Sequence, residues 1–463
     1  MSKKIPPKIN LPRKPQYKKI LPGVDFFELF KKIDREYDNC FILESLGEEN
    51  SDSRHCVIGF NPETIIRSKD GKLFVNEEEY EVENPYFALR DMIPDDIICR
   101  NYAGGLVGYL GYDAMNYFEP ALDLHYHPDF DVFMFGLYTD GLIYDMMTGD
   151  VSYFYYTNDR STILEEISRK EPVKTSLKAR EQSPSKTQDE HREMVNETIE
   201  EIINGNTFQC QIGFQRNFEL EGNPVLIYEK LRIINPSPHM FYLKFGEVKL
   251  VGASPELLFR LRQGEVETFP LAGTTRRGKT PEEDRALAKT LLNDPKEIAE
   301  HNMLVDLHRN DLGRVARFGS VKVRRLMDVK RFSHVQHISS EVVGLISKED
   351  DMFTGLAKVF PAGTLSGAPK IESMKIINRI EQEPRGPYGG SVGHFGFNGD
   401  SFHVIPIRTL FVKGQKAFSR ASGGVVYDST PDGEYEEIQR KSAAVIRALE
   451  DFLIQEEDNE VAK

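Results

Sequence analysis

The sequence of 463 residues predicts an α+β fold, on three observations. Hydrophobic residues make up 40% of the chain and charged residues 29%, which is typical of a globular protein with a large core. Segments typical of strands and helices alternate irregularly, and residues 242–259 are typical of a long hairpin. No period of about 20 to 50 residues recurs, which excludes a solenoid or a propeller.

In the N-terminal part, a short helix is predicted from residue 26 and a strand at residues 41–45, FILES. Residues 103–113, AGGLVGYLGYD, place glycines between aliphatic and aromatic residues, which suits strands whose backbones approach closely. A further strand is predicted at residues 132–144. The polar stretch at residues 175–190 has no hydrophobic period and is predicted to be a linker.

The C-terminal part begins with an amphipathic helix at residues 191–204 and a strand at residues 208–218. A helix at residues 226–234 is predicted to end at the sequence NPSP, because proline cannot continue it. Long strands are predicted at residues 332–343 and 402–412.

Charge and composition narrow the class of protein. The chain has 59 basic and 73 acidic residues and a formal charge of −14, which argues against nucleic acid as a partner. It has neither an apolar run of about 18 residues nor a signal-peptide pattern, which argues against a membrane protein. The four cysteines are widely scattered, so free thiols are expected. We expect a cytoplasmic protein.

The segment at residues 295–314 is predicted to be a helix that carries a pair of glutamates on one face, Glu297 and Glu300. Glu300 shares its face with apolar residues three, four and seven positions later, so this face is expected to pack on the core. A carboxylate there is costly unless a positive charge meets it.

A second glutamate pair, Glu434 and Glu437, is followed by Lys441 one helical turn beyond Glu437. Two inward-facing pairs suggest a shared cation, Mg²⁺ held together with an anionic substrate. Two ordinary helices with solvated acidic faces remain the alternative on spacing alone.

Several motifs appear in the order and spacing of the chorismate-utilising enzymes: PLAGTTRRGKTPEED, EIAEHNMLVDLHRNDLGR, FSHVQHISSEV, FPAGTLSGAPK, RGPYGGSVG, IRT and EYEEIQRKSAAVIRAL. Within that family the sequence resembles component I, the large subunit, of anthranilate synthases. The resemblance implies large antiparallel sheets packed as a sandwich with helices on the outside. Residues 186–455 would form the chorismate-binding catalytic region, with an N-terminal region, residues 1–175, packed on it.

The resemblance implies a magnesium and chorismate site. Glu300 and Glu437 would be the principal Mg²⁺ ligands, with Glu297 and Glu434 beside them. The ion would neutralise the ring carboxylate of chorismate and draw electrons from the ring as the C4 hydroxyl leaves. Arg408 resembles a carboxylate clamp. Further substrate contacts are implied for Gly273, Thr274, Tyr388, Gly423, Gly424 and Lys441.

Four residues are implied to carry the chemistry. Glu256 resembles the general acid for the C4 hydroxyl, so its pKa should be raised in a dry site. His337 resembles the histidine of the elimination step, although a lone histidine on a strand is more often structural. Thr364 is a hydrogen-bonding neighbour. Gln209 stands where relatives that add water carry lysine, and an amide cannot deprotonate water, so ammonia is the implied nucleophile.

The predicted reaction is ammonia addition at C2 with loss of the C4 hydroxyl, followed by proton removal and loss of pyruvate to give anthranilate. Aminodeoxychorismate synthases, the nearest alternative, typically carry lysine where this chain has Ala272, and without that amine no covalent adduct at C2 forms. No glutaminase motif is present. Ammonia would therefore come from a separate glutamine amidotransferase subunit, component II.

A regulatory site for L-tryptophan as inhibitor is implied by six residues: Leu43, Glu44, Ser45, Pro238, His239 and Met240. The simpler interpretation of these six residues is an N-terminal strand packed on a turn. For the function of the whole chain, a non-catalytic tryptophan-binding regulatory protein is the alternative from another functional class. Three positions depart from the family pattern. Ser422 stands where glycine is usual, Gly213 replaces a serine, and His239 stands where tyrosine is common.

Overall fold

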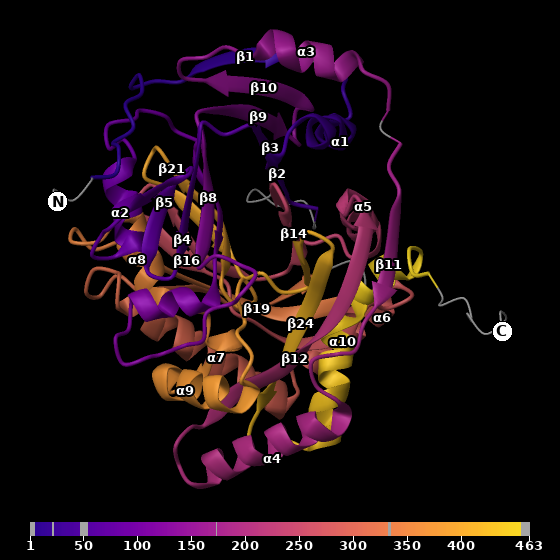
Figure 1. The fold of residues 1–463 in the computed structure, drawn as a ribbon. Helices are drawn as coiled ribbons and strands as arrows, with labels where there is room; N and C mark the ends of the chain where they lie inside the picture. Colours follow the sequence, from indigo (N-terminus) through magenta and orange to yellow (C-terminus); the bar gives the residue numbers. More distant parts are fainter. Residues whose placement is uncertain (1–4, 21–22, 47–53, 173, 332–334, 455–463) are drawn as a thin grey trace, which may run out of the picture.

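The computed structural model describes residues 5–20, 23–46, 54–172, 174–331 and 335–454. Two antiparallel sheets of 12 strands each form its centre, and helices lie around them (Figure 1). The α+β sandwich predicted from the family resemblance is therefore confirmed. None of the helices in the described ranges is long and apolar enough to cross a membrane.

The first sheet joins strands from both ends of the chain. The N-terminal strand β2 (Asn39–Glu44) pairs with β13 (His239–Phe245), with Glu44 opposite Met240. Its strand order is β1 (Gln16–Ile20), β10 (Asp150–Tyr155), β9 (Asp140–Asp145), β3 (His55–Phe60), β2, β13, β14 (Val248–Ser254), β23 (Thr409–Lys413), β24 (Lys416–Val425), β12 (Gln209–Gly222) and β11 (Leu177–Glu181), and β20 (Gly367–Ala368) also pairs with β12.

The second sheet is joined in the same way, because β7 (Gly105–Leu110) pairs with β21 (Ser391–Gly396). Its order is β17 (Leu271–Arg276), β19 (Val335–Leu345), β16 (Glu265–Thr268), β15 (Leu257–Arg262), β22 (Ser401–Val404), β21, β7, β8 (Phe133–Tyr138), β4 (Thr64–Lys69), β5 (Lys72–Val75) and β6 (Glu78–Tyr80), and β18 (Lys322–Arg331) pairs with β19. A side chain at Gly108 in β7 would come within 1.9 Å of the Met134 carbonyl oxygen, so this strand needs its glycine.

The core lies between the sheets. Phe41 of β2 and Tyr138 of β8 meet edge to face across it, with ring centroids 4.7 Å apart. Both side chains are buried, and burying an aromatic ring of this kind stabilises the fold by about 2–3 kcal/mol. The two predicted regions, residues 1–175 and 186–455, share both sheets, and their division stays a prediction.

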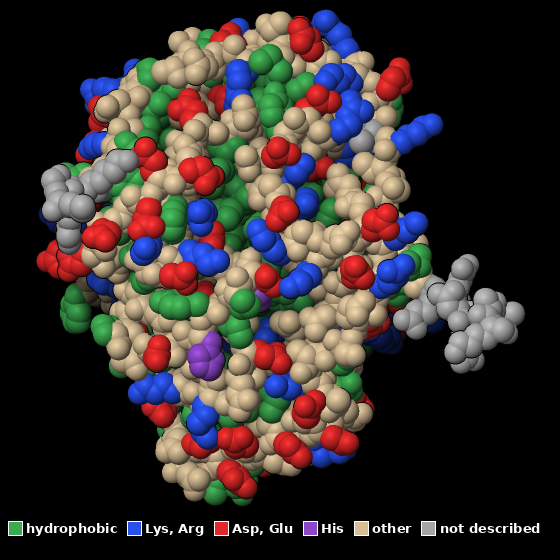
Figure 2. All heavy atoms as spheres, viewed as in Figure 1, with side chains coloured by type: hydrophobic (Ala, Val, Ile, Leu, Met, Phe, Trp, Pro, Cys, Tyr) green, Lys and Arg blue, Asp and Glu red, His purple; other side chains and the backbone are tan. Residues whose placement is uncertain are grey.

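The helices cover the outer faces of the sheets (Figure 1). They are α1 (Phe26–Glu36), α2 (Pro85–Met92), α3 (Ser161–Arg169), α4 (Gln188–Ile203), α5 (Val225–Ile234), α6 (Pro281–Leu291), α7 (Pro295–Gly313), α8 (Met352–Val359), α9 (Lys370–Glu381) and α10 (Pro431–Glu450). On the face in Figure 2, Lys and Arg side chains are interspersed with Asp and Glu, without the basic stripe typical of nucleic-acid binding.

Two sequence predictions are wrong. Residues 177–181 of the predicted linker form β11 and pair with β12, because the alternating residues Leu177 and Ala179 are buried. The predicted long strand at residues 402–412 is two strands, β22 and β23, which belong to different sheets. Between them Arg408 has φ 51°, a left-handed conformation that interrupts the extended chain.

Candidate active site

Two segments pass from one sheet to the other, and each carries a predicted site residue. Ser254, Pro255 and Glu256 lead from β14 in the first sheet to β15 in the second. Residues 405–408 lead from β22 back to β23. The Ile405 N–H donates to the Glu256 carbonyl oxygen at 3.1 Å, so the crossovers are joined and bring Glu256 close to Arg408.

Glu256 is a buried carboxyl group with one hydrogen bond from a side chain. The Thr364 hydroxyl, in the short 3₁₀ turn η2 (Gly363–Leu365), donates to Glu256 Oε1 at 2.8 Å. Burial raises the pKa of Glu256 to about 7, although Thr364, Lys441 and Arg408 all oppose this increase. Glu256 therefore has the raised pKa expected of a general acid.

His337 lies on β19, opposite Thr274 of β17. Its Nδ1 lies 3.0 Å from the Gly273 carbonyl oxygen, which can only accept, so Nδ1 carries the proton. Burial and, to a smaller extent, the charge of nearby Arg408 lower the pKa of His337 to about 4, although the hydrogen bond with the Gly273 backbone opposes this decrease. His337 is thus a neutral imidazole whose other ring nitrogen, Nε2, has a lone pair.

The first glutamate pair lies on α7, which starts at Pro295 after the N-cap Asp294. The face that packs on the core is not the one predicted through Glu300: the buried residues are His301, Leu304, Val305, His308 and Leu312. The prediction was wrong because two histidines belong to the buried stripe, hydrogen-bonded through His301 to Ser340 and through His308 to Thr268. Glu300 keeps access to solvent.

The second glutamate pair lies on the first turns of α10. Glu434 is buried and accepts a hydrogen bond from Ser429 at Oε1. Glu437 forms an ion pair with Lys441 at 2.7 Å, and the Lys441 ammonium group also donates to the Ser422 carbonyl oxygen at 2.8 Å.

The two glutamate pairs lie close to each other. Surrounding protein raises the pKa of Glu300, and the charges of Glu297 and Glu437 raise it further. Burial also raises the pKa of Glu434, with a further contribution from Glu437. Carboxylates on α7 and α10 therefore repel one another across the gap between these helices, and a positive charge bound there would relieve this repulsion.

The negative charge of the two glutamate pairs suits a divalent cation, although these side chains do not form a closed coordination shell. In the described part of the chain, no three His, Cys, Asp or Glu side chains are close enough together to hold a metal unaided. Glu434 Oε2 is buried and has no hydrogen-bond partner among the residues that the structure describes, which leaves a lone pair for a cation. A small protein ligand set is typical of Mg²⁺, which keeps several oxygens from water or substrate.

Three predicted glycines make room for these side chains. A Cβ at Gly273 would lie 2.8 Å from Glu297 Oε2, and one at Gly423 would lie 2.2 Å from Glu434 Oε2. At Gly424 the obstacle would be the Gln209 amide nitrogen, at 2.7 Å. Each glycine therefore lies directly beneath a polar group of the site.

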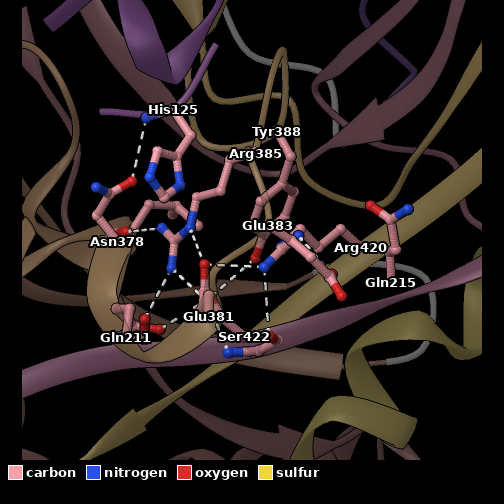
Figure 3. A network of polar contacts seen from close by, with 12 residues as sticks. His125, Gln211, Gln215, Asn378, Glu381, Glu383, Arg385, Tyr388, Arg420 and Ser422 are labelled. Carbon is pink, nitrogen blue, oxygen red and sulfur yellow. Dashed lines mark hydrogen bonds and ion pairs between the residues drawn. The ribbon is translucent and has the colours of Figure 1, made fainter. Parts of the chain in front are cut away.

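Sequence reasoning missed a buried charge cluster close to Tyr388 (Figure 3). Glu381 at the end of α9 accepts from Arg385 at 2.8 Å and pairs with Arg420 of β24 at 2.8 Å. The Tyr388 hydroxyl lies 2.9 Å from Ser422 Oγ. Arg385 stands in the RGPYGGSVG motif, which could have drawn attention to it, whereas nothing in the sequence marks Glu381 or Arg420.

The six residues predicted for tryptophan all line one cavity of about 640 Å³ between the sheets. Glu44 directs its carboxylate to Arg232 at 2.9 Å and Tyr228 at 2.9 Å. Pro255 and Leu257, which flank Glu256, also line the cavity. This cavity therefore shares a wall segment with the predicted general acid.

The chain is similar to proteins of known activity over nearly its whole length. A family model described as chorismate binding enzyme matches residues 38–447. Anthranilate synthase component 1 of Leptospira biflexa is 56% identical over 452 residues, which cover 96% of this chain and 98% of the relative. The protein of that name from Methanothermobacter thermautotrophicus is 42% identical, covering 92% of each chain.

Solved structures agree. Anthranilate synthase component I from Streptococcus pneumoniae superposes with a TM-score of 0.76 at 32% identity, covering 86% of this chain and 93% of that one. The menaquinone-specific isochorismate synthase of Escherichia coli, at 19% identity, has a TM-score of 0.71 and covers 95% and 96% of the two chains. The second likeness concerns the fold alone.

Proposed function

The chain belongs to the family of chorismate binding enzymes and, within it, to the anthranilate synthase component 1 proteins, and on this premise we propose that it converts chorismate and ammonia to anthranilate and pyruvate in tryptophan biosynthesis. One observation carries the proposal. Glu256, with a pKa of about 7, lies beside Arg408 on crossovers between the sheets, and the same Lys441 that influences Glu256 is paired with Glu437. This proximity of Glu256, Arg408 and the acidic side chains around Lys441 supports the assignment of all of them to one site.

Glu256 is assigned to proton donation. Its Oε1 accepts from Thr364, so the acidic proton resides on Oε2, from where it can pass to the departing C4 hydroxyl. Water leaves as ammonia forms its bond to C2. Arg408 is assigned to a substrate carboxylate, because its planar guanidinium can donate two parallel hydrogen bonds.

We assign Mg²⁺ to Glu300 and Glu437, with Glu297 and Glu434 beside them, where a bound ion would supply positive charge to the ring carboxylate of chorismate. The repulsion among these carboxylates and the unpartnered Glu434 Oε2 support the assignment. Gly273, Thr274, Tyr388, Gly423, Gly424 and Lys441 are assigned to substrate contacts.

His337 is assigned to the second stage. With Nδ1–H held by the Gly273 carbonyl, Nε2 can accept the C2 proton as the C3–O bond breaks and the ring becomes aromatic, and the departing enolate becomes pyruvate by taking up a proton. The low pKa keeps the imidazole neutral, so it is available at physiological pH.

The residues that select ammonia are Gln209 and Ala272. The Gln209 amide, which lies over Gly424, cannot act as a base toward water. Ala272 supplies no amine for a covalent adduct at C2. We assign the supply of ammonia to a separate glutamine amidotransferase subunit, so the chain alone should use ammonium salts and not glutamine.

A fluorescence assay for anthranilate tests this function. Chain, chorismate, ammonium chloride and Mg²⁺ should give anthranilate, and Glu256→Gln should lower kcat by about 10²–10⁴-fold. Glu436→Gln is the control for the same change of side chain outside the site. Glu436 lies next to Glu437 in the sequence, but its side chain is 73% exposed. Accumulation of aminodeoxychorismate, or anthranilate formed from glutamine by the chain alone, would contradict the proposal.

We assign feedback inhibition by L-tryptophan to the cavity lined by Leu43 to Ser45 and Pro238 to Met240. The shared wall around Pro255 and Leu257 supports this, because a ligand there would contact both neighbours of Glu256. Isothermal titration with L-tryptophan should show binding, and the anthranilate assay should show inhibition. Absence of heat and of inhibition would remove the regulatory role and leave the catalytic one untouched.

A further inference from the structure

Tyr388 has its hydroxyl group inside the protein, where Ser422 meets it. The two oxygens are 2.9 Å apart, and each residue is 2% exposed (Figure 3). Ser422 Oγ also lies 3.2 Å from Gln211 Oε1, so the three side chains form one hydrogen-bonded series. Because Tyr388 precedes β21 and Ser422 lies on β24, the series connects a loop to a strand of the other sheet.

Each hydroxyl group has only one proton, so the series has a direction. Gln211 Oε1 can only accept, and Ser422 donates to it. Ser422 Oγ then accepts the Tyr388 proton. The Tyr388 hydroxyl is thereby fixed in rotation, with its lone pairs turned away from Ser422.

The ring of Tyr388 is held by the buried charge cluster. The guanidinium carbons of Arg385 and Arg420 lie 5.8 and 6.0 Å from its centroid, where a cation is attracted to an aromatic ring. Both guanidinium groups are fixed by Glu381. The arginine side chains therefore fix the position of the Tyr388 ring. Ser422 fixes what remains free, the rotation of the hydroxyl proton about the C–O bond.

The strand opposite Ser422 carries a glycine at the paired position. Gly213 of β12 pairs directly with Ser422. A Cβ at Gly213 would lie 2.0 Å from the Ala421 carbonyl oxygen and 2.6 Å from the Ser422 Cα, so no side chain fits there. The two departures at positions 213 and 422 are thus opposite each other, and the hydroxyl group at this pair resides on β24.

We propose that Ser422 is a positioning residue that holds the proton of the Tyr388 hydroxyl and so leaves its lone pairs to accept a hydrogen bond from the C4 hydroxyl of chorismate. This rests on the proposed function, in which Tyr388 contacts the substrate. Ser422 does not itself touch chorismate, so its loss weakens binding without removing any group that takes part in the chemistry. The expected signature is a change in KM for chorismate with kcat nearly unchanged.

A double-mutant cycle tests the proposal. Ser422→Ala should raise KM for chorismate by roughly fivefold, since the hydrogen bond that holds the Tyr388 hydroxyl is lost, and change kcat by less than about twofold. In a Tyr388→Phe background, Ser422→Ala should change KM by less than about twofold, because the hydroxyl through which it acts is gone. Ser419→Ala is the matched control, equally buried on β24 but three positions away and so on the opposite face.

Two results would overturn the proposal: an unchanged KM in Ser422→Ala, or an equal KM increase in both backgrounds. Thermal unfolding of every variant separates these effects from loss of the fold. Ser422→Gly is a second variant that lacks the hydroxyl group, and it lacks the Cβ as well. If the unmodified chain made no anthranilate, the proposed function would fail, and the same cycle measured as chorismate affinity by calorimetry would still test the role of Ser422.

Discussion

Two clusters of charged side chains, one partly open to solvent and one buried, differ in how their charge is balanced. The acidic cluster brings together carboxylates from α7 and α10 that have few hydrogen-bond or ion-pair partners. Its residues are Glu297, Glu300, Glu434 and Glu437. The arginine cluster, Glu381, Arg385 and Arg420, has one carboxylate shared by two guanidinium groups and the Gly213 N–H. Burial raises the pKa of Glu300 and would raise that of Glu381, but Arg385 and Arg420 lower the pKa of Glu381 overall.

This difference in charge balance distinguishes a cluster with a structural role from one with a functional role. In the arginine cluster the chain supplies its own counter-charge, so the group is complete and stabilises one arrangement of α9 and β24. In the acidic cluster Lys441 forms an ion pair with Glu437, while Glu300 and Glu434 receive weaker opposing influence from Lys441 and Lys296, and the remaining negative charge favours a cation from solution. Substitutions in the two clusters should therefore have opposite effects on stability.

The largest effect is expected from Glu381→Gln. It removes the carboxylate that Arg385 and Arg420 share and leaves Glu383, 3.7 Å from Arg420, as a carboxylate partner, which should lower the free energy of unfolding by about 3–5 kcal/mol. Urea denaturation measures this. Glu372→Gln on the same helix is the control, because its ion pair with Lys375 is half-exposed and should contribute less than about 1 kcal/mol. Equal effects in the two variants would mean that the arginine cluster has no special structural role.

Glu300→Gln should show the reverse. In the absence of Mg²⁺ the substitution removes repulsion from Glu297 and Glu437, so the free energy of unfolding should stay unchanged or rise. Activity should fall by at least about 100-fold, because a proposed metal ligand is lost. Denaturation with EDTA present, and the anthranilate assay with Mg²⁺, measure the two quantities. Destabilisation as large as that in Glu381→Gln would contradict the distinction between the clusters.

Addition of Mg²⁺ should stabilise the unmodified chain and not Glu437→Gln. A ligand that binds only the folded state at about 100 times its Kd contributes about 2.7 kcal/mol. For a chain of this size we expect a rise in Tm of a few degrees. Sodium chloride at matched ionic strength is the control for screening. An equal rise in both proteins would place the ion elsewhere.

The sequence predicted the acidic cluster better than the arginine cluster, for a physical reason. Glu297, Glu300, Glu434 and Glu437 stand three apart on helices, a spacing that a single sequence displays. The arginine cluster is assembled from α9, the following loop and β24, which no local pattern connects. Fully buried charge also breaks the hydrophobic pattern by which cores are recognised.

The fold was predicted where local patterns agree with packing. The helix from residue 26 is present as α1, and the glycine-rich stretch forms β7. The strand prediction at residues 402–412 failed because a crossover between sheets resembles a continuous apolar run. That crossover and the one at Glu256 are also the places where the chain leaves regular structure to bring the predicted site residues together.

Glu256 is a third kind of carboxyl group: it is buried, and the nearby charges of Arg408 and Lys441 only partly offset the effect of burial on its pKa. The smallest of the expected effects concerns this residue. Because its pKa is raised to about 7, the acid form is present below that pH and is lost above it. If Glu256 donates the proton, kcat/KM should be halved at the pKa and fall further as the pH rises.

Thr364→Val tests this assignment with a shift of known sign. The Thr364 hydroxyl donates to the carboxylate and lowers the pKa of Glu256, so its removal should move the descending limb of the kcat/KM profile to higher pH. One hydrogen bond corresponds to a shift of less than about one pH unit. The limb should not move in Ser419→Ala. A shift to lower pH in Thr364→Val would mean that the limb belongs to another group, and the acid of this site would then have to be sought in the acidic cluster.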